Sequence, residues 1–315
     1  MMRQGMVWHA IGGVMLLACL LLCLLCSTSC RGGGSAAQGT VAAEEGGGSG
    51  QESAAGASPG AEPEGEPLSA VRSFALAIHN SWLNQPYRPY LELWPELEQL
   101  AAVMTPEKAA TLLEDKSLTV VERHLAEIAL ALKERPGTFA DAEGYYEWWV
   151  RSGCRTRIPT LPRLKPEHLT PEYRAAWEWR LLTHWTHMGG PTPAHALAAI
   201  GDTRSLELMV VVYQWAFQRG PAISEGYFVL AGLGHWKQEG LPQALEAARE
   251  CWAYAQSLVG QELPWGPVTE DCPERALGAI AWSFPVDFIA SQSAEAEPGS
   301  AQAAFLQAVQ QQRPR

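Results

Sequence analysis

Residues 206–217, LELMVVVYQWAF, decide the fold class, because they are apolar nearly all round. A helix with apolar side chains on every face is buried at the centre of a domain. On both sides of this stretch, from Leu68 to Ile289, apolar residues recur at spacings of three and four, and we find no run that alternates as a strand would. The pattern therefore predicts an all-α fold with a central helix at 206–217.

Other helices are indicated by their apolar faces and their first residues. One is expected from Leu68 to Leu83, and a second from about Tyr90 to Met104. Thr-Pro pairs at 105–106, 170–171 and 192–193 predict further helix starts, since threonine caps the first turn and proline fits its first position. The face of the first helix is expected to comprise Val71, Phe74, Ala75, Ile78 and Trp82.

Short paired helices raise the question of a repeat. Residues 112–130 and 196–208 each resemble a HEAT repeat, in which an Asp and an Arg tie the turn between helices to its neighbour. This resemblance implies that Asp202 and Arg204 are structural residues of such a turn. Phe228, Gly232, Ala244, Ala248 and Cys251 instead resemble a tetratricopeptide unit. Both families imply antiparallel helix pairs in an α-solenoid-like array, and a non-repeating helical domain is the alternative.

The first thirty residues have the order of a secretory signal. Arg3 precedes an apolar stretch from Ile11 to Cys26, and small polar residues lead to Cys30. This order resembles the bacterial lipoprotein signal, although Ser27 stands where that family usually has leucine. The resemblance implies removal of residues 1–29 and a lipid on Cys30. Cleavage without a lipid, an uncleaved membrane anchor and a buried core helix are the competing interpretations.

Residues 31–67 are predicted to be a disordered tether. They contain Gly/Ser runs, six glutamates and no apolar residue larger than Val41, so they bury too little surface to offset the entropy of ordering. A Gly/Ser chain of this length spans on the order of 35 Å. The expected organisation is a signal at 1–29, the lipidated cysteine and tether at 30–67, a helical domain at 68–291 with a lobe break near 152–171, and a flexible tail at 292–315.

The net charge limits the classes of partner, and the cysteine content limits the possible disulfides. The formal net charge of -11 argues against nucleic acid. After the signal and Cys30 are set aside, Cys154, Cys251 and Cys272 remain, and Cys251 with Cys272 is the shortest disulfide. Two histidines three residues apart, His184 and His187, are weak metal candidates, because no third ligand is placed by the sequence. No cofactor is expected.

Candidate binding and catalytic residues are aromatic and acidic. Tyr145, Tyr146, Trp148 and Trp149 could line a ligand groove, although helical spacing buries at least two such rings in a packed array. No catalytic signature is found. Three glutamates near aromatic residues could act as acids or bases, but such carboxylates are usually solvated; they are Glu147, Glu178 and Glu225.

These features favour a membrane-tethered protein of the cell envelope. It is expected to be lipid-anchored outside the cytoplasm, on the cell membrane or the outer membrane, and to bind a protein partner as a helical interaction or scaffold module. The alternative is an envelope enzyme that acts on glycan or peptidoglycan through carboxylates in a Trp-rich cleft. A purely structural envelope component is a third interpretation.

The predicted lipid anchor can be tested at a single atom, the sulfur of Cys30. Replacing Cys30 by Ala should leave an uncleaved precursor or release the protein from the membrane fraction, because the lipid would have no thiol to join. Immunoblots of membrane and soluble fractions measure both outcomes. An unchanged mature size together with unchanged membrane association would contradict the anchor.

Overall fold

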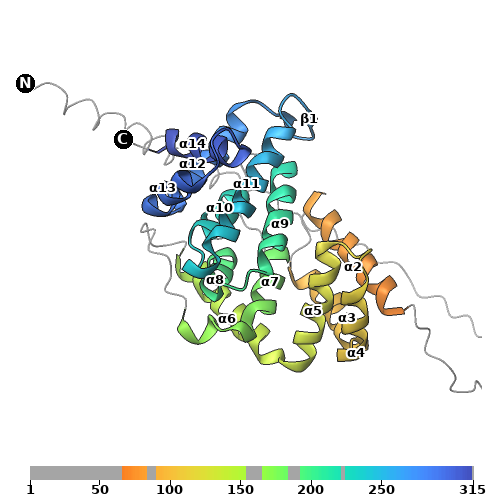
Figure 1. Cartoon of the computed structure of the whole chain (residues 1–315). Helices are drawn as coiled ribbons and strands as arrows, with labels where there is room; N and C mark the ends of the chain where they lie inside the picture. Colours follow the sequence, from red (N-terminus) through yellow and green to blue (C-terminus); the bar gives the residue numbers. More distant parts are fainter. Residues whose placement is uncertain (1–65, 84–89, 154–164, 184–191, 221–223, 314–315) are drawn as a thin grey trace, which may run out of the picture. The chain divides into compact units, whose positions relative to one another are not determined.

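The computed structural model describes residues 66–83, 90–153, 165–183, 192–220 and 224–313, all within the second of two units of the chain, residues 60–315. The described part is built from helices, which confirms the predicted all-α class (Figure 1). Its strands β1 (Glu262–Leu263) and β2 (Gly266–Pro267) form one short antiparallel hairpin. The α-helices are α2 (Glu66–Leu83), α3 (Tyr90–Val103), α4 (Pro106–Glu114), α5 (Val120–Glu134), α6 (Pro136–Gly153), α7 (Arg174–Thr183), α8 (Thr192–Ile200), α9 (Ser205–Arg219), α10 (Ser224–Gly234), α11 (Leu241–Ser257), α12 (Asp271–Ser283), α13 (Val286–Glu295) and α14 (Ala301–Gln311).

Helix α9 lies at the centre of these helices, as its sequence predicts. It contacts α2, α5, α7, α10 and α11, and in Figure 1 it passes between the N-terminal and C-terminal helices. Buried side chains occur on several of its faces, among them Leu208, Met209, Val212, Tyr213 and Trp215. This apolar helix is therefore surrounded by protein instead of water on nearly all sides.

Helix α2 packs against helices that are distant in the chain. The face predicted from the sequence is buried, from Val71 to Trp82, and the helix contacts α5 and α9 as well as α3. The indole of Trp82 donates a hydrogen bond of 2.7 Å to the carbonyl of Leu182, 100 residues further along the chain. In a solenoid each repeat contacts only its neighbours. These long-range contacts differ from that pattern, so a simple stacked array is not confirmed.

Close helix packing around α10 depends on glycine. A Cβ atom on Gly232 would lie 2.7 Å from the Cβ of Ala194 in α8, and a Cβ on Gly234 would overlap Ser283 in α12. No side chain larger than hydrogen fits at either point without a shift of the neighbouring helix. These two glycines therefore allow α8 and α12 to approach α10 from different sides.

Several helix starts follow the expected capping chemistry. Thr105 accepts a hydrogen bond of 3.2 Å from the backbone of Lys108 at the start of α4. Thr119 and Glu122 form a reciprocal capping box at the start of α5. Thr170 is followed first by a 3-10 turn, η2 (Pro171–Tyr173), and α7 begins only at Arg174. Two further 3-10 turns are η1 (Pro166–His168) and η3 (Gln238–Gly240).

The boundaries of the domain differ from the prediction mainly at its C-terminal end. Residues 292–315 were expected to form a flexible tail, but α14 packs against α12 and α13. Its Phe305, Leu306 and Val309 are buried, and Phe305 lies 5.3 Å from the ring of Trp252. The flexible-tail prediction is wrong because three apolar residues on one face suffice to dock an Ala- and Gln-rich helix.

The N-terminal segment and the predicted lobe break are described only in part. The signal, Cys30 and nearly all of the tether lie outside the described residues, and α2 begins at Glu66, two residues before the expected boundary. Residues 154–164 of the break also lie outside them. None of the helices in the described ranges has the length and apolar character needed to cross a bilayer.

Docking of α14 can be tested with one core residue and one surface residue of the same helix. Phe305→Ala should lower the free energy of unfolding by about 3 kcal/mol, because it leaves a cavity beside Trp252. Gln307→Ala, at an exposed position, is the control and should change it by less than about 0.5 kcal/mol. Denaturation midpoints measure both, and equal midpoints for the two variants would show that α14 contributes nothing to stability.

Candidate functional site

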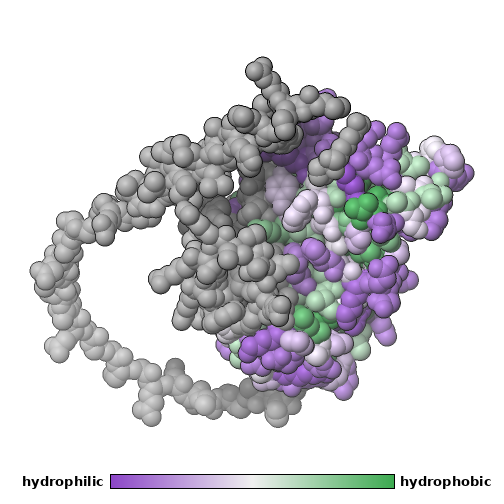
Figure 2. Space-filling model, turned by 90° about the vertical axis from the view of Figure 1, so that its left-hand side faces the viewer, coloured by the Kyte–Doolittle hydropathy of each residue, from purple (hydrophilic) through white to green (hydrophobic). Residues whose placement is uncertain are grey.

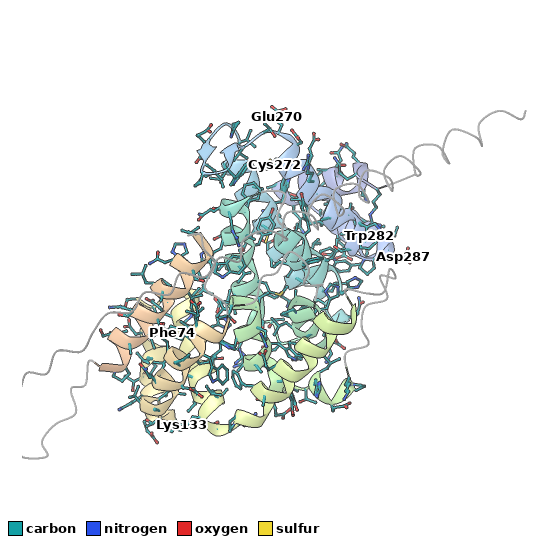
Figure 3. The ribbon with its side chains drawn as sticks, turned by 180° about the vertical axis from the view of Figure 1, so that it is seen from behind. Phe74, Lys133, Glu270, Cys272, Trp282 and Asp287 are labelled. Carbon is teal, nitrogen blue, oxygen red and sulfur yellow. The ribbon has the colours of Figure 1, made fainter. Side chains whose placement is uncertain are left out.

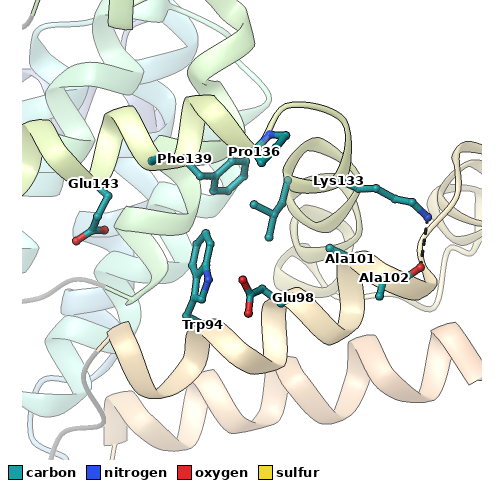
Figure 4. A pocket seen from close by; sticks show the side chains of 10 residues that line it. Trp94, Glu98, Ala101, Ala102, Lys133, Pro136, Phe139 and Glu143 are labelled. Atoms are coloured by element: carbon teal, nitrogen blue, oxygen red, sulfur yellow. Dashed lines mark hydrogen bonds between the residues drawn. The ribbon is translucent and has the colours of Figure 1, made fainter.

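An apolar groove lies between α3, α5 and α6 in the described part of the chain. Its volume is about 620 Å³, which is within the usual range for small-molecule or side-chain pockets. Figure 4 shows the groove with its lining side chains drawn as sticks. These residues are Trp94, Glu98, Ala101, Ala102, Leu132, Lys133, Pro136, Phe139, Ala140 and Glu143.

Two aromatic rings form the apolar end of this groove. The half-buried indole of Trp94 lies 6.3 Å from the ring of Phe139, at an interplanar angle of 60°. Trp94 also lies 6.4 Å from the buried indole of Trp179 in α7. The groove is therefore open outside and supported by the domain core beneath it, so its aromatic wall is held in place by packing.

Charged groups in the groove are mostly committed to other protein atoms. The ammonium of Lys133 donates to the carbonyl oxygens of Met104, at 2.6 Å, and Ala102, at 3.3 Å. Glu143 forms an ion pair with the buried Arg180 of α7. Glu98 is exposed and makes no ion pair or hydrogen bond with the rest of the described chain. Lys133 keeps its positive charge, but its ammonium is bound to two backbone carbonyl oxygens, so Glu98 is the charged group of the lining without a partner in the described chain.

A second cluster of charged residues lies in the interior, where α5, α7 and α9 meet. Glu178 of α7 is 0% exposed. One of its oxygens accepts hydrogen bonds from the hydroxyl of Ser205, at 2.6 Å, and from Arg174, at 3.0 Å. The other lies 3.2 Å from the Nδ1 atom of His124. Although burial raises the pKa of Glu178, these partners lower it below its ordinary value, so the carboxylate is charged.

His124 lies between two carboxylates. Its Nδ1 atom faces Glu178, and its Nε2 atom lies 3.4 Å from Glu207 of α9. Only the imidazolium can donate from both ring nitrogens. Burial alone would lower the pKa of His124, and Arg174 lowers it too, but Glu178 and Glu127 raise it above its ordinary value. The two carboxylates thus favour the imidazolium form of His124, and its contacts with them join three helices.

The turn residues Asp202 and Arg204 lie at the edge of this cluster, between α8 and α9. Arg204 donates to Asp202 through Nε, at 3.1 Å, and through Nη2, at 2.6 Å. The side chain of Arg204 is 63% exposed, and Asp202 lies 3.5 Å from the buried Arg174. Asp202 is therefore the residue that reaches another helix, whereas Arg204 pairs within its own turn.

The other residues predicted from the sequence lie only in part within the described residues. Cys30, His184 and His187 lie outside the described residues. Tyr145, Tyr146, Trp148 and Trp149 belong to α6, but their side chains are also outside them. Cys251 and Cys272 are both buried free thiols, so the predicted disulfide is absent from the structure. The Cys272 sulfur instead lies 3.8 Å from the hydroxyl of Thr269 within its own helix start.

Catalytic and metal-binding groups are limited in the described part. Glu178, expected on a solvated face, is enclosed by the protein, which leaves it no access to a substrate. Glu147 and Glu225 have side chains outside the described residues. Within the described ranges, no three His, Cys, Asp or Glu side chains are placed to hold a metal ion.

An exposed apolar corner occurs where α12 meets α13. Trp282 is 79% exposed and Val286 66% exposed, and Figure 3 shows Trp282 close to the acidic Asp287. The described part of the face drawn in Figure 2 is mainly hydrophilic, with small apolar patches. Single exposed apolar side chains are common on protein surfaces. The groove between α3, α5 and α6 is therefore the stronger candidate site.

The charge of His124 predicts a pH-dependent stability. The folded-state pKa is above the ordinary value of 6.5, so the stabilisation is fully present below that pH and is lost as the pH rises through the raised pKa. We expect the free energy of unfolding to fall on the alkaline side of pH 6.5. His124→Gln should remove this part of the slope, measured by denaturant titrations at several pH values.

The control for this experiment is Gln307→Ala, since Gln307 is exposed and carries no titratable group. It should keep the wild-type slope. Burial lowers the pKa of His79, which therefore acts in the opposite direction, but His79 is present in every variant and cancels in the comparison. Parallel pH curves for wild type and His124→Gln would contradict a raised pKa of His124. The charged residues around His124 are Glu178, Glu207, Glu127, Arg123 and Arg174.

Comparison of the chain with protein-family models, with curated proteins and with solved structures found no match. The function is therefore argued from the groove itself and from the charges around it.

Proposed function

We propose that the protein is a membrane-tethered interaction module that binds a partner protein in the groove between α3, α5 and α6. The single observation that supports this function is the groove: an open apolar hollow with an aromatic wall and a free carboxylate. Partly exposed aromatic side chains at the centre of an apolar depression are typical of the residues that dominate protein interfaces.

The sequence supplies the remaining parts of the proposal. A lipid on Cys30 would hold the N-terminus at the envelope membrane, and residues 31–67 would act as a spacer between that anchor and the helices. A reach on the order of 35 Å lets the groove meet partners near the membrane surface. High local concentration near the membrane also strengthens weak binding, because the encounter volume is reduced.

Enzymatic cleavage of glycan is the second interpretation, and the described residues support it less well. Such an enzyme needs two accessible carboxylates at a defined separation. Of the carboxylates that line the groove, Glu143 is neutralised by Arg180 and only Glu98 is free. The groove therefore has the character of a binding surface.

Site-specific photocrosslinking tests the proposed function. A benzophenone amino acid at Ala140, an exposed residue of the groove, should give a crosslinked adduct of defined mass in envelope preparations. The same group at Ala110, an exposed residue of α4 that does not line the groove, is the matched control and should give none.

A second substitution makes the crosslinking result specific to the groove. Ala102→Trp adds bulk at an exposed lining position without removing a core side chain. It should abolish the adduct at Ala140 because the partner can no longer enter. An adduct that forms equally at Ala110, or that survives Ala102→Trp, would contradict binding in the groove.

A further inference from the structure

We propose that the partner segment inserts an arginine between Trp94 and Glu98, next to an apolar anchor side chain that fills the groove. This inference rests on the proposed function and specifies the chemistry of the partner. It is carried by the arrangement of two residues on α3 and by the distribution of charge around them.

Trp94 and Glu98 are four residues apart on α3, so they lie on the same face, one turn from each other. Figure 4 shows both side chains pointing into the groove, with the carboxylate of Glu98 next to the indole of Trp94. A side chain that enters there meets an aromatic surface and a negative charge at the same time.

The charge in the groove selects a cation. Lys133, the basic residue of the lining, is occupied by the carbonyl oxygens of Ala102 and Met104. Glu143 is already paired with Arg180. Helix α3, which forms one wall, carries three glutamates and no basic residue. A basic group in the groove would therefore find an unpartnered carboxylate in Glu98, whereas an acidic group would meet an ammonium that is already bound to two carbonyl oxygens.

Arginine fits this site better than lysine does. Its planar guanidinium can stack on an indole and form hydrogen bonds to a carboxylate in the same orientation. The ammonium of lysine is more strongly hydrated and loses more on entering an apolar groove. The preference for arginine follows from the combination of Trp94 with Glu98, and neither residue alone would produce it.

The rest of the groove suits an apolar anchor. Beyond Trp94 the walls are formed by Leu132, Phe139 and Ala101, which are all buried residues of the core. A volume of about 620 Å³ holds a few side chains of a peptide segment and is too small for a folded domain. The partner is thus a short segment with a bulky apolar residue and a nearby arginine.

The test uses the full-length protein in detergent micelles and synthetic peptides followed by fluorescence anisotropy. Each labelled peptide carries two leucines and, one, three or four residues later, an arginine, a citrulline or a glutamate. Micelles without protein provide the background for every peptide. We expect the arginine peptide with the best spacing to bind at least about threefold more tightly than its citrulline version, which has the same shape without the charge.

Variants at Glu98 test the charge. Glu98→Gln should remove the difference between the arginine and citrulline peptides, and Glu98→Arg should reverse the preference toward the glutamate peptide. Glu114→Gln removes an exposed carboxylate of α4 outside the groove and should change nothing. Ala102→Trp should abolish binding of all peptides, whereas Ala110→Trp should not.

The outcomes separate this inference from the proposed function. If the arginine, citrulline and glutamate peptides bind equally, or Glu98→Gln has no effect while Ala102→Trp blocks binding, the groove binds peptides but the arginine inference is wrong. If no peptide binds above background, or binding survives Ala102→Trp, both proposals are overturned. Charge reversal by Glu98→Arg, with loss of binding in Ala102→Trp, supports both.

Discussion

The carboxylate of Glu178 is the constraint on which the described helices depend. It is fully enclosed, and a buried charge is tolerated only when partners replace the water that it has lost. The partners come from three helices: His124 from α5, Arg174 from α7 itself and Ser205 from the first turn of α9. Any sliding of these helices would leave a charge without a partner, so the network restricts them to one relative position.

The same helices support the groove. Helix α5 is one wall of the groove and also carries His124. Helix α7 carries Glu178 and Arg180, and the ion pair of Arg180 with Glu143 joins α7 to α6. Trp179 of α7 packs behind Trp94 of α3. The internal charges and the aromatic stack therefore act on all three walls of the groove from beneath. A surface preorganised in this way loses less conformational freedom when a partner binds.

Interior and surface charges thus have different roles in this protein. Inside, carboxylates pair with His124, Arg174 and Arg180, and these pairs fix the relative positions of the helices. At the groove, Glu98 is left without a partner in the described chain and lies in a mainly apolar lining, which makes its carboxylate accessible to a bound group. In the proposed function, the tether would separate this surface from the membrane, so that different parts of the chain would bind the partner and anchor the protein.

The sequence by itself determined the local features of the fold. Apolar spacing correctly identified the buried face of α2 from Val71 to Trp82 and the central position of α9, and the Thr-Pro pair at Thr105 correctly marked a helix start. These features depend on residues within about four positions of one another, because helix periodicity and capping act over that range. Helix α14 was missed because its apolar face is short and its composition is that of a loose tail.

Only the tertiary structure decided what those helices build. The groove combines residues of three separate helices, and the internal charge network joins His124 to Glu178. No local sequence pattern therefore predicts the groove or the network. Glu178 was expected on a solvated face for this reason, and the contact of α2 with α9 was not foreseen in a repeat-like sequence. Local sequence specifies which residues turn inward, whereas the partner that each inward residue meets depends on how the whole chain packs.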